Sequence, residues 1–353
     1  PVGQVRFPEL RLEPLAHLDP GGPVALSPDG RSIAYVDQGL RILDTATGRT
    51  RQVAGPVPTC LAWSPDGRCL AAGFAGAASS RLQRLDPQGA LKAEAEVAGC
   101  LTSLHWSGDG ALLALALQVQ RFRFGTQLAE VLQSWKGTAP PTPRTLCEAT
   151  LMPREAERLA PLLPRRLTFS ISPFGDEILY ARLYSPPALP SRVRWMLFPL
   201  GAGREREVAE AALEGGVARF APDGLSALCG DGRSTCRRLD LWGDRVLARF
   251  PEPGREVAES ASGRWQFMDG VLWCDGRSVH TFPPGSRAWF APRGGLAWVA
   301  EGDRLFRLSG AGEPPPARPD AAEAARIRRL RRWLAQGLIA SEDYRKQAEG
   351  GRP

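Results

Sequence analysis

A short turn phrase recurs seven times along this chain. Two copies are nearly identical, Ala-Leu-Ser-Pro-Asp-Gly at Ala25–Gly30 and Ala-Trp-Ser-Pro-Asp-Gly at Ala62–Gly67. Weaker copies occur at His105–Gly110, Ile171–Gly175, Phe220–Gly224, Glu259–Gly263 and Phe290–Gly294. A unit that recurs about every 40 residues cannot bury its apolar face alone, so neighbouring units must stack. The chain is therefore expected to fold as an array of seven repeats.

Each repeat reads as four short strands separated by turns. The second repeat gives Thr59–Trp63, Cys69–Phe74, Arg81–Asp86 and Lys92–Val97. Its turn phrase suits a tight turn, because proline presets φ, aspartate bonds nearby main-chain N–H groups and glycine accepts a left-handed conformation. Four-stranded antiparallel units arranged radially form a β-propeller. The expected fold class is all-β, a seven-bladed β-propeller over residues 1–310 with a short C-terminal α-helical hairpin.

The seventh repeat lacks a fourth strand of its own. Its strands are expected at Arg287–Phe290, Gly295–Glu301 and Arg304–Leu308, after which a Gly/Pro-rich segment follows. Upstream of the first phrase, Glu9–Leu15 alternates polar and apolar residues without a partner in its own repeat. We expect this segment, or the preceding Gln4–Phe7, to supply the outer strand of the last blade and so close the ring.

The phrases, followed by strands such as Arg68–Ala72, resemble WD-repeat-type and TolB-type propellers over about residues 5–310. The resemblance implies the fold and leaves the function open. The aspartates of the phrase, Asp29, Asp66, Asp109 and Asp223, are expected to bond main-chain groups of their own turns. The tryptophans in strand-like runs are expected to pack between blades.

Regular spacing fails before the fourth phrase, where 65 residues separate Ser107 from Ser172. With Gln127–Gln133 as the outer strand of blade 3, residues 134–166 are expected to form an insertion. Loops of that length are uncommon without a use. Trp135, in the expected insertion, could anchor a partner as exposed tryptophans often do. The basic residues of the insertion could meet an acidic partner; they are Lys136, Arg144, Arg154, Arg158, Arg165 and Arg166. The alternative is a solvated loop that packs over the blade edge.

The second departure is the C-terminal tail, with a Pro/Gly linker at 311–319 and a helical hairpin at 320–353. Ile327, Leu330, Trp333, Leu334 and Leu338 fall on one arc of the first helix. Four arginines fall on another arc; they are Arg328, Arg329, Arg331 and Arg332. The run from Ile327 to Tyr344, with its Gly337-Leu338-Ile339 turn and acidic helix start, resembles the SHOCT family of short C-terminal domains. That resemblance implies an oligomerisation or tethering element, with the four arginines and Trp333 as candidate contacts.

Chemistry-bearing motifs are scarce. The three histidines have no metal-site spacing, and no nucleophile elbow, P-loop or dinucleotide fingerprint occurs. No catalytic residue, metal or cofactor is predicted. The seven cysteines form no CxxC pair and are expected to be reduced, and no signal peptide or membrane span is evident, so a cytoplasmic location is expected.

The leading hypothesis is a non-enzymatic protein-interaction scaffold, in which the propeller is the platform and the C-terminal hairpin mediates self-association or tethering. Two alternatives stay open. One is a propeller enzyme with its site at the central channel. The other is a nucleic-acid-associated factor that uses the basic tail, because residues 314–353 hold nine Lys/Arg and five Asp/Glu, a net charge of +4.

Overall fold

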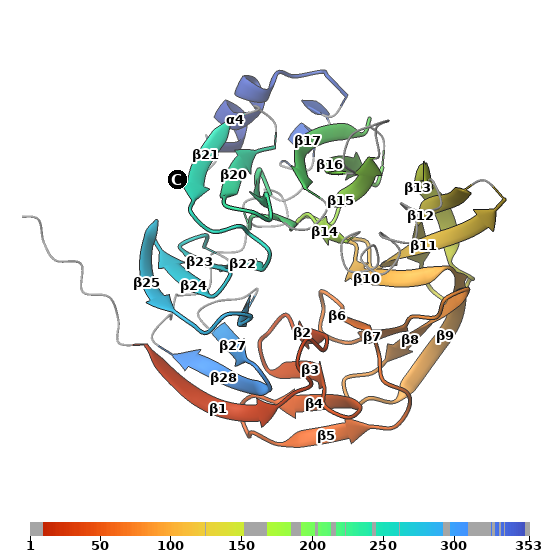
Figure 1. Cartoon of the computed structure of the whole chain (residues 1–353), viewed down its shortest axis with the longest axis vertical. Coiled ribbons are helices and arrows are strands. Elements are labelled where there is room, and N and C mark those ends of the chain that lie inside the picture. The colour runs from red at the N-terminus through yellow and green to blue at the C-terminus, as the bar shows by residue number, and fades with distance from the viewer. Residues whose placement is uncertain are drawn as a thin grey trace, which may run out of the picture.

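The chain forms seven four-stranded antiparallel sheets arranged around a ring (Figure 1). This confirms the seven-bladed propeller that the turn phrases predict. The computed structural model describes residues 10–123, 125–151, 168–184, 192–201, 204–212, 217–222, 224–241, 245–260, 262–291, 297–309, 326, 329–331, 333–334 and 336–349.

The first three blades run in chain order from the inner to the outer strand. Blade 1 is β2 (Val24–Leu26), β3 (Ser32–Val36), β4 (Leu40–Asp44) and β5 (Thr50–Val53). Blade 2 is β6 (Cys60–Trp63), β7 (Leu70–Phe74), β8 (Ser79–Leu85) and β9 (Leu91–Ala98). Blade 3 is β10 (Cys100–Trp106), β11 (Leu112–Phe122), β12 (Gly125–Trp135) and β13 (Thr142–Leu151).

The next three blades repeat the order. Blade 4 is β14 (Phe169–Ile171), β15 (Glu177–Tyr184), β16 (Arg192–Pro199) and β17 (Arg206–Ala212). Blade 5 is β18 (Ala218–Phe220), β19 (Ser226–Gly230), β20 (Cys236–Asp240) and β21 (Val246–Phe250). Blade 6 is β22 (Val257–Glu259), β23 (Trp265–Met268), β24 (Val271–Cys274) and β25 (Arg277–Thr281).

The ring closes through the N-terminal strand. Blade 7 contains β26 (Arg287–Phe290), β27 (Ala297–Glu301) and β28 (Arg304–Ser309), and its outer strand is β1 (Arg11–His17). The pairing runs antiparallel from Arg11 opposite Ser309 to His17 opposite Arg304. The strand expected around Glu9–Leu15 therefore closes the last blade, whereas Gln4–Phe7 lies outside the described residues.

The repeated aspartates serve their own turns. In the second phrase, Ser64 Oγ donates to Asp66 Oδ1 at 2.6 Å and the main-chain N–H of Arg68 donates to the same oxygen at 3.0 Å. These bonds hold the pKa of Asp66 below its ordinary value. Gly67 adopts a left-handed φ of 72°. Asp29 and Asp109 are bonded in the same way, and Asp223 lies outside the described residues.

Tryptophans join neighbouring blades as expected. Trp63 Nε1 donates to the carbonyl of Ala25 in the preceding blade at 3.2 Å, and Trp106 Nε1 donates to the carbonyl of Ala62 at 3.1 Å. Each indole therefore bonds its one polar group across two sheets, and the Trp63 ring is buried between them.

Blade 3 differs from the sequence-based expectation. The segment around Gln127–Gln133 is the third strand, β12, and the outer strand is β13. Residues 134–151 therefore belong to the blade, and the expected insertion from 134 to 166 is wrong over that part. Pro143 obscured the strand, since proline cannot donate to a sheet ladder; on an outermost strand it is tolerated, because one side has no partner. Residues 152–167 lie outside the described part of the chain.

Candidate functional site: the docked C-terminal hairpin

The fourth turn phrase departs from the others and forms the site. It reads Ser172-Pro-Phe-Gly-Asp176, so an aromatic ring occupies the position of the repeated aspartate. The carboxylate is not lost, because Ser172 Oγ donates to Asp176 Oδ1 at 2.7 Å. Asp176 thus replaces the turn aspartate from two positions later in the chain, and Phe174 is left for another contact.

Arg331, from the C-terminal tail, occupies this turn. Its guanidinium carbon lies 4.9 Å from the centre of the Phe174 ring, and its Nη1 donates to the carbonyl of Gly224 at 2.7 Å. Its Nε lies 3.8 Å from Asp176 Oδ2, and its Nη2 forms an ion pair with Glu177. We call these four residues, Phe174, Asp176, Glu177 and Gly224, the Arg331 seat.

The ion pair of Arg331 with Glu177 is almost closed to solvent. The exposed fraction of the Arg331 side chain is 2% and that of Glu177 is 5%. Burial lowers the pKa of Arg331, while the carboxylate of Asp176 opposes the shift. An arginine stays protonated in proteins, so the seat holds a buried positive charge against two carboxylates.

Apolar contacts continue the docking. Leu330 and Tyr344 are buried at 3% and 1% exposure and pack on Leu225, the residue after the turn glycine of blade 5, together with Leu334 and Ile339. Helical residues occur at 326, 329–331, 333 and 334, followed by a turn and by α4 (Ser341–Glu349). The hairpin therefore lies against blades 4 and 5 (Figure 1).

The outer side of the hairpin carries exposed apolar groups. The exposed fraction is 38% for Trp333 and 66% for Leu338. Arg329 is exposed as well. The hairpin thus presents both a cation and large apolar side chains to solvent.

Arg331 corrects part of the prediction for the tail. It was expected among the four arginines that meet a partner, but it binds its own propeller. The physical reason is that the Arg331 guanidinium finds two carboxylates on blade 4 and a main-chain carbonyl on blade 5. Arg328 and Arg332 lie outside the described residues.

The three described candidates of the blade 3 segment do not gather into a site. Trp135 is 2% exposed at the end of β12, with the Arg84 guanidinium 4.1 Å from its ring centre, so the expectation of an exposed anchor is wrong. Lys136 Nζ lies 2.7 Å from Asp109 Oδ2, and this bond lowers the pKa of Asp109 to about 2. Arg144 lies over the ring of Phe198 at 4.3 Å.

The four remaining candidates, Arg154, Arg158, Arg165 and Arg166, lie outside the described residues. Sequence reasoning missed the Arg331 seat itself. The signal was present in the fourth phrase, where phenylalanine replaces aspartate and an Asp176-Glu177 pair follows the turn glycine.

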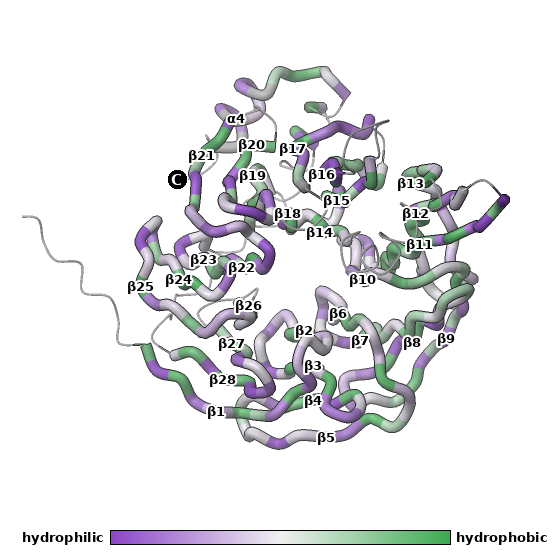
Figure 2. The backbone as a smooth tube through the Cα atoms, in the orientation of Figure 1, coloured by the Kyte–Doolittle hydropathy of each residue, from purple (hydrophilic) through white to green (hydrophobic). Residues whose placement is uncertain are grey.

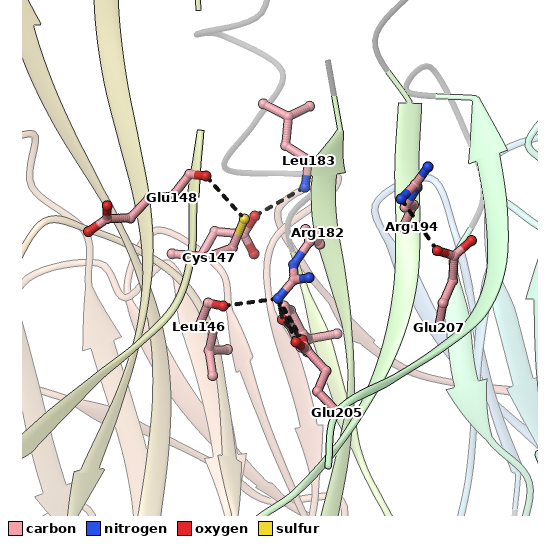
Figure 3. Close-up of polar contacts among 10 residues, drawn as sticks. Leu146, Cys147, Glu148, Arg182, Leu183, Arg194, Glu205 and Glu207 are labelled. Atoms are coloured by element: carbon pink, nitrogen blue, oxygen red, sulfur yellow. Dashed lines mark hydrogen bonds and ion pairs between the residues drawn. The ribbon is translucent and has the colours of Figure 1, made fainter. Parts of the chain in front are cut away.

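A second polar cluster lies between blades 3 and 4 (Figure 3). Arg182 on β15 donates to a main-chain carbonyl of β13 at 3.1 Å and to both carboxylate oxygens of Glu205 at 2.7 and 2.8 Å. The main-chain N–H of Leu183 donates to Glu130 of β12 at 3.2 Å. Burial raises the pKa of Glu130 to about 8 and that of the nearby Cys147 thiol to about 11. The Cys147 thiol is therefore protonated near neutral pH, and the bonds of Arg182 and Glu130 join the two blades.

All seven cysteines are free thiols. Among the described residues, no three His, Cys, Asp or Glu side chains come together in a way that could hold a metal ion. No described helix is long and apolar enough to cross a membrane.

No protein-family model matches the chain, and no curated protein matches its sequence. Solved structures do resemble it. A structure of hydrazine synthase from Kuenenia stuttgartiensis matches with a TM-score of 0.56 and 14% identity, covering 88% of this chain and 99% of that one. The Cps50 (Swd1) β-propeller domain of Myceliophteria thermophila matches with a TM-score of 0.56 and 15% identity, covering 86% and 98%. At these identities the likeness shows the propeller fold alone.

Proposed function

We propose that this protein is a non-enzymatic interaction scaffold, in which the propeller holds the C-terminal hairpin in a fixed position for a protein partner or a second copy of the chain. The observation that supports the proposal is the orientation of the hairpin. Arg331, Leu330 and Tyr344 face the propeller, whereas Trp333 and Leu338 face solvent. Tryptophan is enriched among the residues that dominate binding energy at protein interfaces.

The chemistry of the described residues supports a contact role. The turn aspartates are bonded within their turns, and burial keeps the Cys60 and Cys147 thiols protonated by raising their pKa values to about 12 and about 11. The fixed position of the hairpin reduces the ordering cost that a flexible tail would meet on binding. The propeller's part in this function is therefore to preorganise the exposed side of the hairpin.

The test compares two variants with matched chemistry. Trp333→Ala combined with Leu338→Ser removes the exposed apolar groups of the hairpin, and Leu247→Ser removes an apolar side chain of 51% exposure on β21. We expect the double variant to lose the partners that the native protein recovers from its host, or its self-association measured by light scattering. Leu247→Ser should retain them. If the double variant keeps the same partners and the same mass as the native protein, the proposal is wrong.

The nucleic-acid alternative predicts a different dependence of binding on salt concentration. Phosphate contacts make affinity fall steeply with salt concentration, whereas an apolar interface responds weakly. Binding of labelled DNA or RNA that falls with salt and is weakened by Arg329→Ala would favour that alternative. The enzyme alternative places its site at the central channel. Conversion of a substrate by the native protein that the double variant retains would favour it.

A further inference from the structure

Strand β11 continues beyond the end of its inner partner. The pairing of β10 with β11 ends at Cys100 opposite Leu117, but β11 runs on to Phe122 and there pairs only with β12. Within the described residues, blade 3 therefore has four strands along Leu112–Leu117 and three along residues 118–122. An edge of this kind presents main-chain N–H and C=O groups that can pair with another strand.

The side chains of residues 119–122 on this edge are exposed. Val119 and Phe122 are each 48% exposed, and Gln120 and Arg121 are exposed too. On the side away from β12, the bond that the described residues make is at the start of the extension, where Gln118 Nε2 donates to the carbonyl of Ala98 at 3.5 Å. The β11–β12 hairpin reaches outward from the ring (Figure 1), and its outer end is strongly hydrophilic (Figure 2).

Blade 4 has a similar strand extension, but there the edge is occupied. The ladder between β14 and β15 ends at Tyr180, while β15 continues to Tyr184. The main-chain N–H of Leu183, on that continuation, donates to the buried carboxyl of Glu130 at 3.2 Å. No described side chain bonds the β11 main chain at residues 119–122 in this way. The contrast leaves β11 as an edge with capacity to pair.

We propose that residues 118–122 of β11 dock an extended acidic peptide segment of a partner protein, which adds to blade 3 as a strand that continues the line of β10. Main-chain hydrogen bonds would supply affinity, and alternate apolar side chains of the peptide would contact Val119 on one face or Phe122 on the other. This surface goes beyond the proposed function, because it lies on blade 3 and does not use the hairpin on blades 4 and 5.

Charge selects the occupant. Arg121 is exposed at this end of the β11–β12 hairpin, so acidic residues in the added strand would lie near its guanidinium. A second copy of the chain fits less well. Antiparallel self-pairing centred on Gln120 would make the two Arg121 side chains diagonal neighbours on the same face, and nearby like charges destabilise a strand pair.

The first experiment is a charge exchange on the full-length protein. The probe is a fluorescein-labelled peptide of alternating Val and Glu, about eight residues long, which exceeds the roughly 17 Å of a five-residue edge. We expect Arg121→Glu to weaken its binding at least about tenfold in fluorescence anisotropy. A peptide of alternating Val and Lys should bind the native protein weakly and Arg121→Glu more tightly.

Arg277→Glu, which reverses an exposed arginine on β25, is the matched control and should bind the Glu peptide like the native protein. Equal affinity of the Glu peptide for all three proteins would overturn the proposal. So would absence of binding to the native protein.

The second experiment tests the main-chain contacts. N-methylation of every second peptide residue removes the donors that face the protein in one phase and leaves them intact in the other. Only one of the two methylated Val-Glu peptides should bind, and binding should slow hydrogen exchange of the amides at residues 119–122. Equal binding of both peptides, or a concentration-dependent dimer that Val119→Asp abolishes, would overturn the acidic-peptide assignment, the latter in favour of a second copy.

Discussion

The buried ion pair between Arg331 and Glu177 holds the hairpin against the propeller. Arg331→Ala would leave Glu177 buried without its cation, and removing one partner of a buried ion pair costs about 3–5 kcal/mol. We predict that this variant releases the hairpin and speeds proteolytic cleavage within residues 326–349. Arg329→Ala, at an exposed position, should be cleaved at the native rate. Native cleavage kinetics in Arg331→Ala would contradict the role of the seat.

Glu130 sets a pH dependence of stability. Its pKa is raised by burial from 4.5 to about 8, so between these pH values the folded protein retains a proton that the unfolded chain releases. The contribution of this group to stability is complete below pH 4.5 and is lost as the pH rises toward 8. We predict that Glu130→Gln removes this loss and is more stable than the native protein at pH 8. Urea unfolding across the pH range measures the difference, and parallel pH profiles of the two proteins would refute it.

Single residues also show which features could be predicted from the sequence. The role of Asp66 was predictable, because its bonding partners lie within the turn and within two residues of it. The burial of Trp135 was not, because it depends on Arg84 from another blade. Local hydrogen bonds can be derived from local sequence, whereas burial depends on which blade packs alongside.

At the scale of elements, Gly224, the turn glycine of blade 5, is in direct contact with the C-terminal hairpin. A Cβ on Gly224 would lie 2.6 Å from Phe174 Cε2 and 2.8 Å from Arg331 Nη1. We predict that Gly224→Ala displaces the hairpin as well as straining the turn, since a left-handed alanine alone costs about 1–2 kcal/mol. Cleavage within residues 326–349 should therefore accelerate.

Gly110→Ala provides the matched control for this prediction. Gly110 holds the equivalent turn position at φ 80°, and a Cβ there would meet nothing within 4 Å. Both variants should lose stability through backbone strain, but only Gly224→Ala should expose the tail to protease. Equal cleavage of the two variants would mean that strain alone is responsible.

Strand positions were largely predictable, because period-two alternation and the turn phrases delimit each strand. The four strands of blade 2 lie within two residues of the expectation at both ends. The expectation for blade 3 was wrong because its second and third strands are each 11 residues long. Strand lengths typical of the other blades led to Gln127–Gln133 being assigned as the outer strand, although it lies in the third strand, β12.

For the whole molecule, closure of the ring depends on a strand far away in sequence. Deletion of residues 1–17 would remove β1 and leave β28 as an unpaired edge. We predict that the truncated protein melts at lower temperature and associates into larger species on gel filtration. Deletion of residues 1–9 keeps β1 and should leave both properties unchanged. A monomeric 18–353 protein with native melting would show that β1 is dispensable.

The number of blades could be counted from the sequence, because each copy of the phrase marks one inner turn. The place where the tail docks could not, since it joins residues 107 positions apart. Such long-range contacts have no periodic signature. They require the fold to be known first.

Pairing of Arg11 with Ser309 also fixes an order of events during synthesis. A ribosome adds about 5–20 residues per second, so β1 emerges roughly 15–60 s before its partner exists. During that interval blades 1 to 6 can fold in turn, while β1 remains unpaired. Strand β1 is therefore placed long after it is made, and a nascent chain stalled before residue 304 would carry an open ring.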